Sequence, residues 1–239
     1  MCGNLIVSKG SLYVYLFELN LRNLLYRHLM QNPELLRYKE QSPYEKSGAL
    51  TREQYLFNET RVVGELYLQG MSDEEIIEKV YNENLFRYPT EKMLRNIARV
   101  CLKRIHALEN ERLIKALVEM PGSIAKQVCL YAMMKQNCLI NDFMLKVIGH
   151  KFIERDYGFS KLVVSSFLID LQEQDPWVAS WSPSTINKIR QVIVKTLVDN
   201  EYLDDNKSRQ LNTITINSVL EEVLREKDKA ALAAFNCLY

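Results

Sequence analysis

Four basic residues recur at helical spacing, three, four and four positions apart: Lys92, Arg95, Arg99 and Lys103. This spacing places them on one helix face over about three turns. Such a row can follow nucleic-acid phosphates and release their counterions, and Asn96 beside it can donate to a base edge. Between Pro89 and His106 these four residues and Arg104 are opposed by Glu91 alone, which gives a local net charge of +4. A solvated face normally carries i to i+4 Glu–Lys pairs, which this pattern lacks, so we predict a nucleic-acid contact, with a solvated face as the alternative.

A second set of polar and basic residues follows Ser182-Pro183, on one face of another predicted helix: Asn187, Lys188, Gln191 and Lys195. These are side chains that can read or grip a duplex, and Lys207 and Arg209 in a following loop can reach a backbone as a wing does. Acidic residues follow closely, which favours an ordinary solvated surface instead: Asp199, Glu201, Asp204 and Asp205. We keep Lys188, Gln191 and Lys195 as a second predicted DNA contact.

The sequence offers little for catalysis. It contains no GxxxxGK[ST], GxGxxG or GxSxG pattern, which are the common phosphate cradles and the nucleophile elbow. Asp205-x-Lys207 is better explained as turn chemistry than as part of a nuclease site. The five Cys form no CxxC pair and the three His lie far apart, so neither a zinc site nor a disulfide framework is indicated. We expect no catalytic, cofactor or metal residues and reduced, cytoplasmic thiols.

Regular helix signals position the first basic row. Ser72 with Glu75 forms a capping box, and Thr90 is a suitable cap for the next helix. The apolar stripe of that helix is spaced three, four, four and three: Leu94, Ile97, Cys101, Ile105 and Leu108. Pro121-Gly122 ends the helical run, and Gly70 suits a helix C-terminus. The pattern predicts a small bundle compatible with a helix-turn-helix arrangement.

The second set of polar residues is placed by a helix that begins at Ser182-Pro183 and buries Ile186, Ile189, Ile193 and Leu197. Tyr202-Leu203, a polar loop, and the alternating residues 213–216 predict a short β-hairpin after it. Helix followed by hairpin is the order of a winged helix. We therefore expect a mainly α protein with two small bundles, the second ending in a winged-helix-like helix and hairpin.

Composition fits this fold class. The chain has 239 residues, 47% hydrophobic and 26% charged, with a net charge of +1, which is typical of a globular protein. No stretch approaches the roughly 18 apolar residues of a membrane span, so we expect no membrane association. We predict three parts: an N-terminal extension of uncertain structure at 1–47, one bundle at 48–120, and another with the hairpin at 121–239.

Motifs spread over residues 47–203 resemble the BrxA family of bacteriophage-exclusion (BREX) defence systems. Their order and spacing carry the resemblance, in the segments Ser47-Gly48-Ala49-Leu50-Thr51, Gly70 to Ile76, Asn84-Leu85-Phe86, Arg104-Ile105 with Leu108, Leu130 to Lys135, Trp181-Ser182 with Thr185, Lys188 and Gln191, and the closing Leu197, Tyr202 and Leu203. The resemblance implies an all-helical protein whose fold is likened to that of the antitermination factor NusB. It also implies that this protein binds DNA and works beside other BREX components. It implies no catalytic residue, and residues 1–29 look additional to the family pattern.

These observations lead to one hypothesis and two alternatives. The hypothesis is a non-catalytic, double-stranded DNA-binding accessory protein of a BREX system, with other BREX subunits as partners. The first alternative is a protein–protein adaptor that holds other defence subunits through an apolar patch. The second is an RNA-binding protein, which the NusB likeness would permit.

Overall fold

The computed structural model describes residues 42–44 and 49–237. The chain divides into two compact units between Pro43 and Tyr44, and the helices described here belong to the unit that begins at Tyr44. The predicted extension at 1–47 lies almost wholly outside the described residues and stays a prediction.

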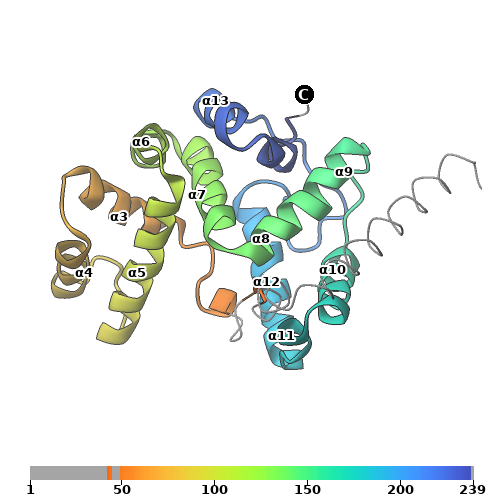
Figure 1. Ribbon diagram of the computed structural model, residues 1–239, viewed down its shortest axis with the longest axis horizontal. Helices are drawn as coiled ribbons and strands as arrows, with labels where there is room; N and C mark the ends of the chain where they lie inside the picture. The colour runs from red at the N-terminus through yellow and green to blue at the C-terminus, as the bar shows by residue number, and fades with distance from the viewer. Residues whose placement is uncertain (1–41, 45–48, 238–239) are drawn as a thin grey trace, which may run out of the picture. The chain divides into compact units, whose positions relative to one another are not determined.

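The described part of the chain is built from α-helices, which confirms the predicted mainly α character of the fold (Figure 1). In chain order they are α3 (Phe57–Leu68), α4 (Asp73–Asn82), α5 (Glu91–Leu108), α6 (Glu111–Glu119), α7 (Gly122–Gln136), α8 (Cys138–Phe143), α9 (His150–Ile153), α10 (Lys161–Gln174), α11 (Pro176–Ala179), α12 (Pro183–Asp199) and α13 (Ser218–Lys227). A π-helical segment, Met144–Gly149, joins α8 to α9, and 3-10 segments cover Ala49–Thr51 and Lys229–Phe235. No helix among residues 42–44 and 49–237 combines the length and apolar character that crossing a membrane requires.

Local sequence signals set most helix ends. The Ser72–Glu75 capping box is formed, with the Ser72 hydroxyl accepting from the Glu75 N–H and the Glu75 carboxylate accepting from the Ser72 N–H. The Thr90 hydroxyl accepts from the Met93 N–H at the start of α5. Gly70 has a φ of +81°, a left-handed conformation that glycine adopts without steric cost, and it follows the end of α3.

The first helices pack around the apolar side of α5. The predicted stripe is buried: Leu94, Ile97, Cys101, Ile105 and Leu108 are each at most 9% exposed. Helices α3, α4 and α7 all contact α5, and α6 contacts both α3 and α7. Because α7 packs against α5 and α6, the core is continuous across residues 120 and 121. The division into bundles at that point stays a prediction about folding units.

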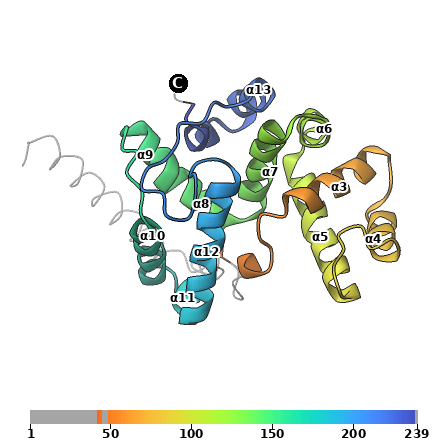
Figure 2. The same ribbon diagram turned by 180° about the vertical axis from the view of Figure 1, so that it is seen from behind.

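Helix α12 organises the later half of the fold. Its residues Ile189, Ile193 and Leu197 are buried, whereas Ile186 is partly exposed, and α10 packs along it. Figure 2 shows α12 facing the viewer, with α10 and α11 on one side and α7 on the other. The 3-10 segment Lys229–Phe235 packs against the π-helical segment and α9, and α13 contacts that 3-10 segment and α6.

The predicted β-hairpin is wrong, because the described residues contain no strand and a single antiparallel bridge, between Gly158 and Gln210. The segment at 209–211 pairs with 157–159 instead, through the Phe159 N–H to the Arg209 carbonyl and the Leu211 N–H to the Tyr157 carbonyl. Tyr202 and Leu203, the other expected strand, are buried in the core. A single backbone hydrogen bond, from the Asn212 N–H to the Tyr202 carbonyl, lies near the two expected strands, and one such bond does not make the ladder of a hairpin.

Candidate nucleic-acid interface

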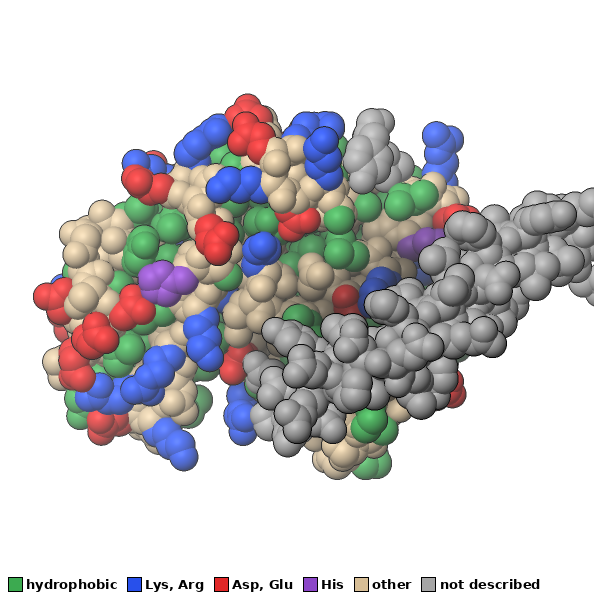
Figure 3. Space-filling model, in the orientation of Figure 1, with side chains coloured by type: hydrophobic (Ala, Val, Ile, Leu, Met, Phe, Trp, Pro, Cys, Tyr) green, Lys and Arg blue, Asp and Glu red, His purple; other side chains and the backbone are tan. Residues whose placement is uncertain are grey.

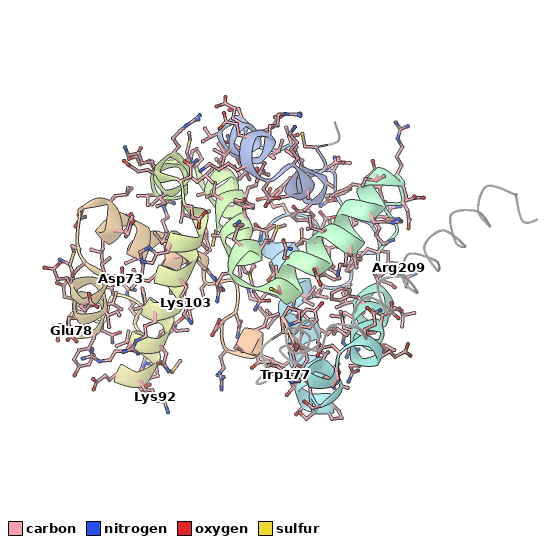
Figure 4. All side chains as sticks on the ribbon, in the orientation of Figure 1. Asp73, Glu78, Lys92, Lys103, Trp177 and Arg209 are labelled. Atoms are coloured by element: carbon pink, nitrogen blue, oxygen red, sulfur yellow. The ribbon has the colours of Figure 1, made fainter. Side chains whose placement is uncertain are left out.

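The exposed side of α5 carries an unpaired basic stripe, defined as Lys92, Arg99 and Lys103 with Asn96 between them. All four side chains are exposed. Within the described part of the chain, none of the three cations lies in ion-pair distance of a carboxylate, and Arg99 donates weakly to Asn96 at 3.4 Å. Figure 4 marks Lys92 near the beginning of α5 and Lys103 further along it. Acidic side chains gather at the edge formed by α4, next to the basic ones over α5 (Figure 3).

Arg95, the fourth predicted phosphate contact, is engaged in holding α4 against α5. Its guanidinium bonds Glu78 on α4 and Glu91 one turn earlier on α5, the latter at 2.8 Å, and lies 4.4 Å from the centre of the Tyr81 ring. The expectation that this face lacks an i to i+4 Glu pair was therefore wrong. Two carboxylates neutralise Arg95, which leaves it less able than Arg99 to bind a phosphate.

We expect Arg95→Ala to lower the thermal midpoint at pH 7, because it releases the contact between α4 and α5. The Arg95 hydrogen bond lowers the pKa of Glu78 in the folded protein. A lowered pKa means that this contribution is present above the unfolded value of about 4.3 and is lost as the pH falls through the folded value. The difference in thermal midpoint between Arg95→Ala and the parent protein should therefore become smaller below about pH 4. Lys92→Ala is the matched control, and equal destabilisation by both changes would contradict the clamp.

Arg104 faces the core and does not contribute to the basic stripe, so the local charge of +4 overstates the exposed charge. Its side chain is fully buried. One guanidinium nitrogen donates to the Glu53 and Gln54 carbonyls at 2.8 and 2.7 Å, and the other donates to the Tyr55 carbonyl. Arg104 thus holds the irregular chain before α3 against α5.

The second predicted cluster lies on the exposed face of α12. Lys188, Gln191 and Lys195 are all exposed, but the Lys195 ammonium lies 2.6 Å from the Asp199 carboxylate. A groove of about 540 Å³ runs along this face. Its charged lining carries a net charge of +3, from Lys161, Lys188, Arg190 and Lys195 against Asp199. This face, called the α12 groove below, keeps a positive balance despite its acidic neighbour.

A further groove of about 510 Å³ separates the two predicted clusters. Met93 and Ile97 of α5 form one wall, and Val192, Lys195 and Thr196 of α12 form the other. It adjoins the α12 groove, because Val192, Lys195 and Asp199 line both. The structure therefore brings α5 and α12 to opposite sides of one depression, while Lys92, Arg99 and Lys103 lie on the neighbouring face of α5 and do not line it.

The predicted wing is not formed as a wing. Asp205 accepts a hydrogen bond from the Lys207 N–H at 2.6 Å, which makes Asp205-x-Lys207 a local turn. Figure 4 places Arg209 near α10, on the opposite side of the fold from Lys92. Lys207 and Arg209 therefore do not extend the α5 stripe.

The titratable groups of the core favour packing over chemistry. Burial raises the pKa of the Cys129 thiol to about 11, so this sulfur is protonated at neutral pH. Among the residues that the structure describes, no three His, Cys, Asp or Glu side chains are grouped to hold a metal ion.

Known proteins resemble this chain over most of its length. The sequence pattern that defines the BrxA family matches residues 44–228. A BREX protein BrxA from Bacillus cereus (strain H3081.97) is 30% identical over 171 residues, which cover 71% of this chain and 85% of that protein. Another BREX protein BrxA, from Escherichia coli O9:H4 (strain HS), is 23% identical over 70% of this chain and 78% of its own length.

A solved structure shares the fold. The crystal structure of an uncharacterized protein from Magnetospirillum magneticum superposes with a TM-score of 0.67, at 20% identity, over 82% of this chain and 98% of that one. This likeness concerns the fold alone, whereas the sequence matches concern the family. The chain belongs to the BrxA family.

Proposed function

We propose that this BrxA-family chain is a non-catalytic, cytoplasmic protein that binds double-stranded DNA and acts with other components of a BREX system. The names of its relatives, which are BREX proteins BrxA, support membership in a BREX system. The observation that carries DNA binding is the unpaired basic stripe on α5, formed by Lys92, Arg99 and Lys103.

The geometry of the stripe suits a phosphate backbone. Lys92 and Lys103 are eleven residues apart on one helix, which corresponds to about 16 Å at 1.5 Å per residue. Phosphates on one strand of a duplex advance about 3.4 Å along its axis per nucleotide, so the stripe reaches several of them. Asn96 lies between the cations and has the side chain that pairs with adenine in a major groove. The α12 groove supplies a second positive surface beyond the depression that separates the helices.

A mobility-shift titration of the purified protein with duplex DNA at several salt concentrations tests this function. Phosphate binding predicts that log affinity falls linearly with log salt, by about 0.9 for each phosphate contacted. Duplex RNA as a competitor tests the alternative of RNA binding, which predicts that RNA displaces the DNA. Affinity that does not depend on salt, or no shift at low salt, would contradict the proposal.

A specific observation supports the adaptor alternative. Leu162 and Ile169 lie seven positions apart on one side of α10 and are 74% and 54% exposed. Two large apolar side chains on one helix face suit contact with another protein. An adaptor of this kind predicts binding to a BREX subunit that is weakened by Leu162→Ser and insensitive to salt.

A further inference from the structure

A segment with unpaired backbone groups borders a polar groove on the α7 side of the fold. The segment is residues 213–216, in which Thr213 and Thr215 are exposed while Ile214 and Ile216 pack partly against the core. This alternation is that of an extended chain. A groove of about 600 Å³ lies between it and the first turns of α7.

The Gln127 side chain already pairs with this segment as a neighbouring strand would. Its amide nitrogen donates to the Thr215 carbonyl at 2.9 Å, and its amide oxygen accepts from the Asn217 N–H at 2.9 Å. A carbonyl and the N–H two residues later are the two groups that one residue of a parallel partner strand would bind. Gln127 therefore fills one pairing position with a side-chain amide.

The next pairing position along the segment is empty. In an extended chain, the N–H and carbonyl groups of alternate residues point to the same side. The Thr213 carbonyl and the Thr215 N–H therefore point toward the same groove as the groups that bind Gln127. Within the described residues, neither group has a hydrogen-bond partner.

The charged residues around the groove favour a basic occupant. Glu201 and Asp204 line it together with a single cation, Lys126, which lies 3.6 Å from Glu201. Asp204 accepts from the Asn212 side chain at 2.8 Å and so lies beside the Thr213 end of the segment. An occupant that carries Lys or Arg at this end would complement Asp204.

We infer that this groove binds an extended, basic peptide segment of a partner protein, which pairs as a parallel strand with Thr213 and Thr215. One partner residue donates its N–H to the Thr213 carbonyl, and its carbonyl accepts from the Thr215 N–H. Strand addition of this kind takes affinity from main-chain hydrogen bonds, which unpaired edges make available. The site is separate from the α5 stripe and does not depend on DNA binding.

The test uses the full chain and a synthetic probe, the peptide acetyl-Arg-Thr-Val-Thr-Val-amide, with amide exchange and chemical shifts followed by NMR. In the free protein, the Thr215 N–H should exchange quickly and the Asn217 N–H slowly. The peptide should protect the Thr215 N–H at millimolar concentration. The same peptide with every backbone amide N-methylated should not bind, because it keeps the side chains and loses the donors.

Two proline variants make the matched comparison. Thr215→Pro removes the N–H of the empty position, whereas Ile214→Pro removes an N–H that points away from the groove and keeps the backbone groups of Thr213 and Thr215. Loss of one hydrogen bond predicts about tenfold weaker peptide binding for Thr215→Pro and binding within about twofold of the parent for Ile214→Pro. The inference is overturned if the parent protein shows no protection of the Thr215 N–H, if the N-methylated peptide binds equally, or if both variants weaken binding alike. If Thr215→Pro does not fold, the comparison of the two peptides on the parent protein still tests the inference.

Discussion

Arg104→Leu is expected to lower the free energy of unfolding by about 3 kcal/mol or more, a large share of the roughly 5–15 kcal/mol that stabilises a domain. The guanidinium is fully buried and donates to the carbonyls of Glu53, Gln54 and Tyr55. A hydrogen bond from a charged donor contributes about 1.5–3 kcal/mol, and leucine would leave the acceptors unsatisfied in an apolar setting. Urea denaturation followed by circular dichroism measures the change.

Two controls isolate the cause. Arg99→Leu makes the same chemical change on the exposed side of α5 and should alter the unfolding free energy by less than about 0.5 kcal/mol. Arg104→Lys keeps the charge but cannot reach several carbonyls with a planar fork, so its stability should lie between those of the parent and Arg104→Leu. Loss of stability in Arg99→Leu equal to that in Arg104→Leu would remove the special role of the buried guanidinium.

Helix ends and the apolar stripe of α5 were predictable because their causes are local. The Ser72–Glu75 capping box and the Thr90 cap need groups only three residues away, and they form as predicted. The apolar positions of α5 follow from helical periodicity alone. The predicted hairpin does not form, because residues 209–211 pair with 157–159 and Gln127 bonds Thr215 and Asn217, and these partners come from distant parts of the chain that local sequence patterns do not identify.

The burial of Arg104 was predictable from its position in the helix, although the local charge count included it with the exposed cations. Arg104 lies three residues after Cys101 and four before Leu108, on the buried side of α5. Helical spacing alone therefore places this residue among the core positions of the helix. The partners of Arg95 were less accessible, because Glu78 comes from α4 and only tertiary packing brings it close. The remaining predicted contacts, including Lys188, Gln191 and Lys195, stay predictions.

The triple change of Lys92, Arg99 and Lys103 to Ala is expected to lower the slope of log affinity for duplex DNA against log salt by about three. Each phosphate contact contributes about 0.9 to that slope, and the three cations are exposed and without carboxylate partners among the residues described. The loss should be equal for unrelated duplex sequences, since phosphates carry no sequence information. Arg95→Ala alone should lower the slope by less than one, because Glu78 and Glu91 already neutralise that guanidinium.

A second triple variant, with Lys135, Lys227 and Lys229 changed to Ala, removes the same charge from exposed positions outside both predicted contacts. It separates a specific phosphate contact from a general effect of net charge, because long-range attraction would fall equally in both variants. Both proteins should melt near the parent temperature, since exposed substitutions usually change stability by less than about 0.5 kcal/mol. If the α5 variant keeps the slope of the parent, its basic stripe is a solvated face. Lys188→Ala would then show whether the α12 groove carries the contact, and a slope unchanged there as well would favour the adaptor.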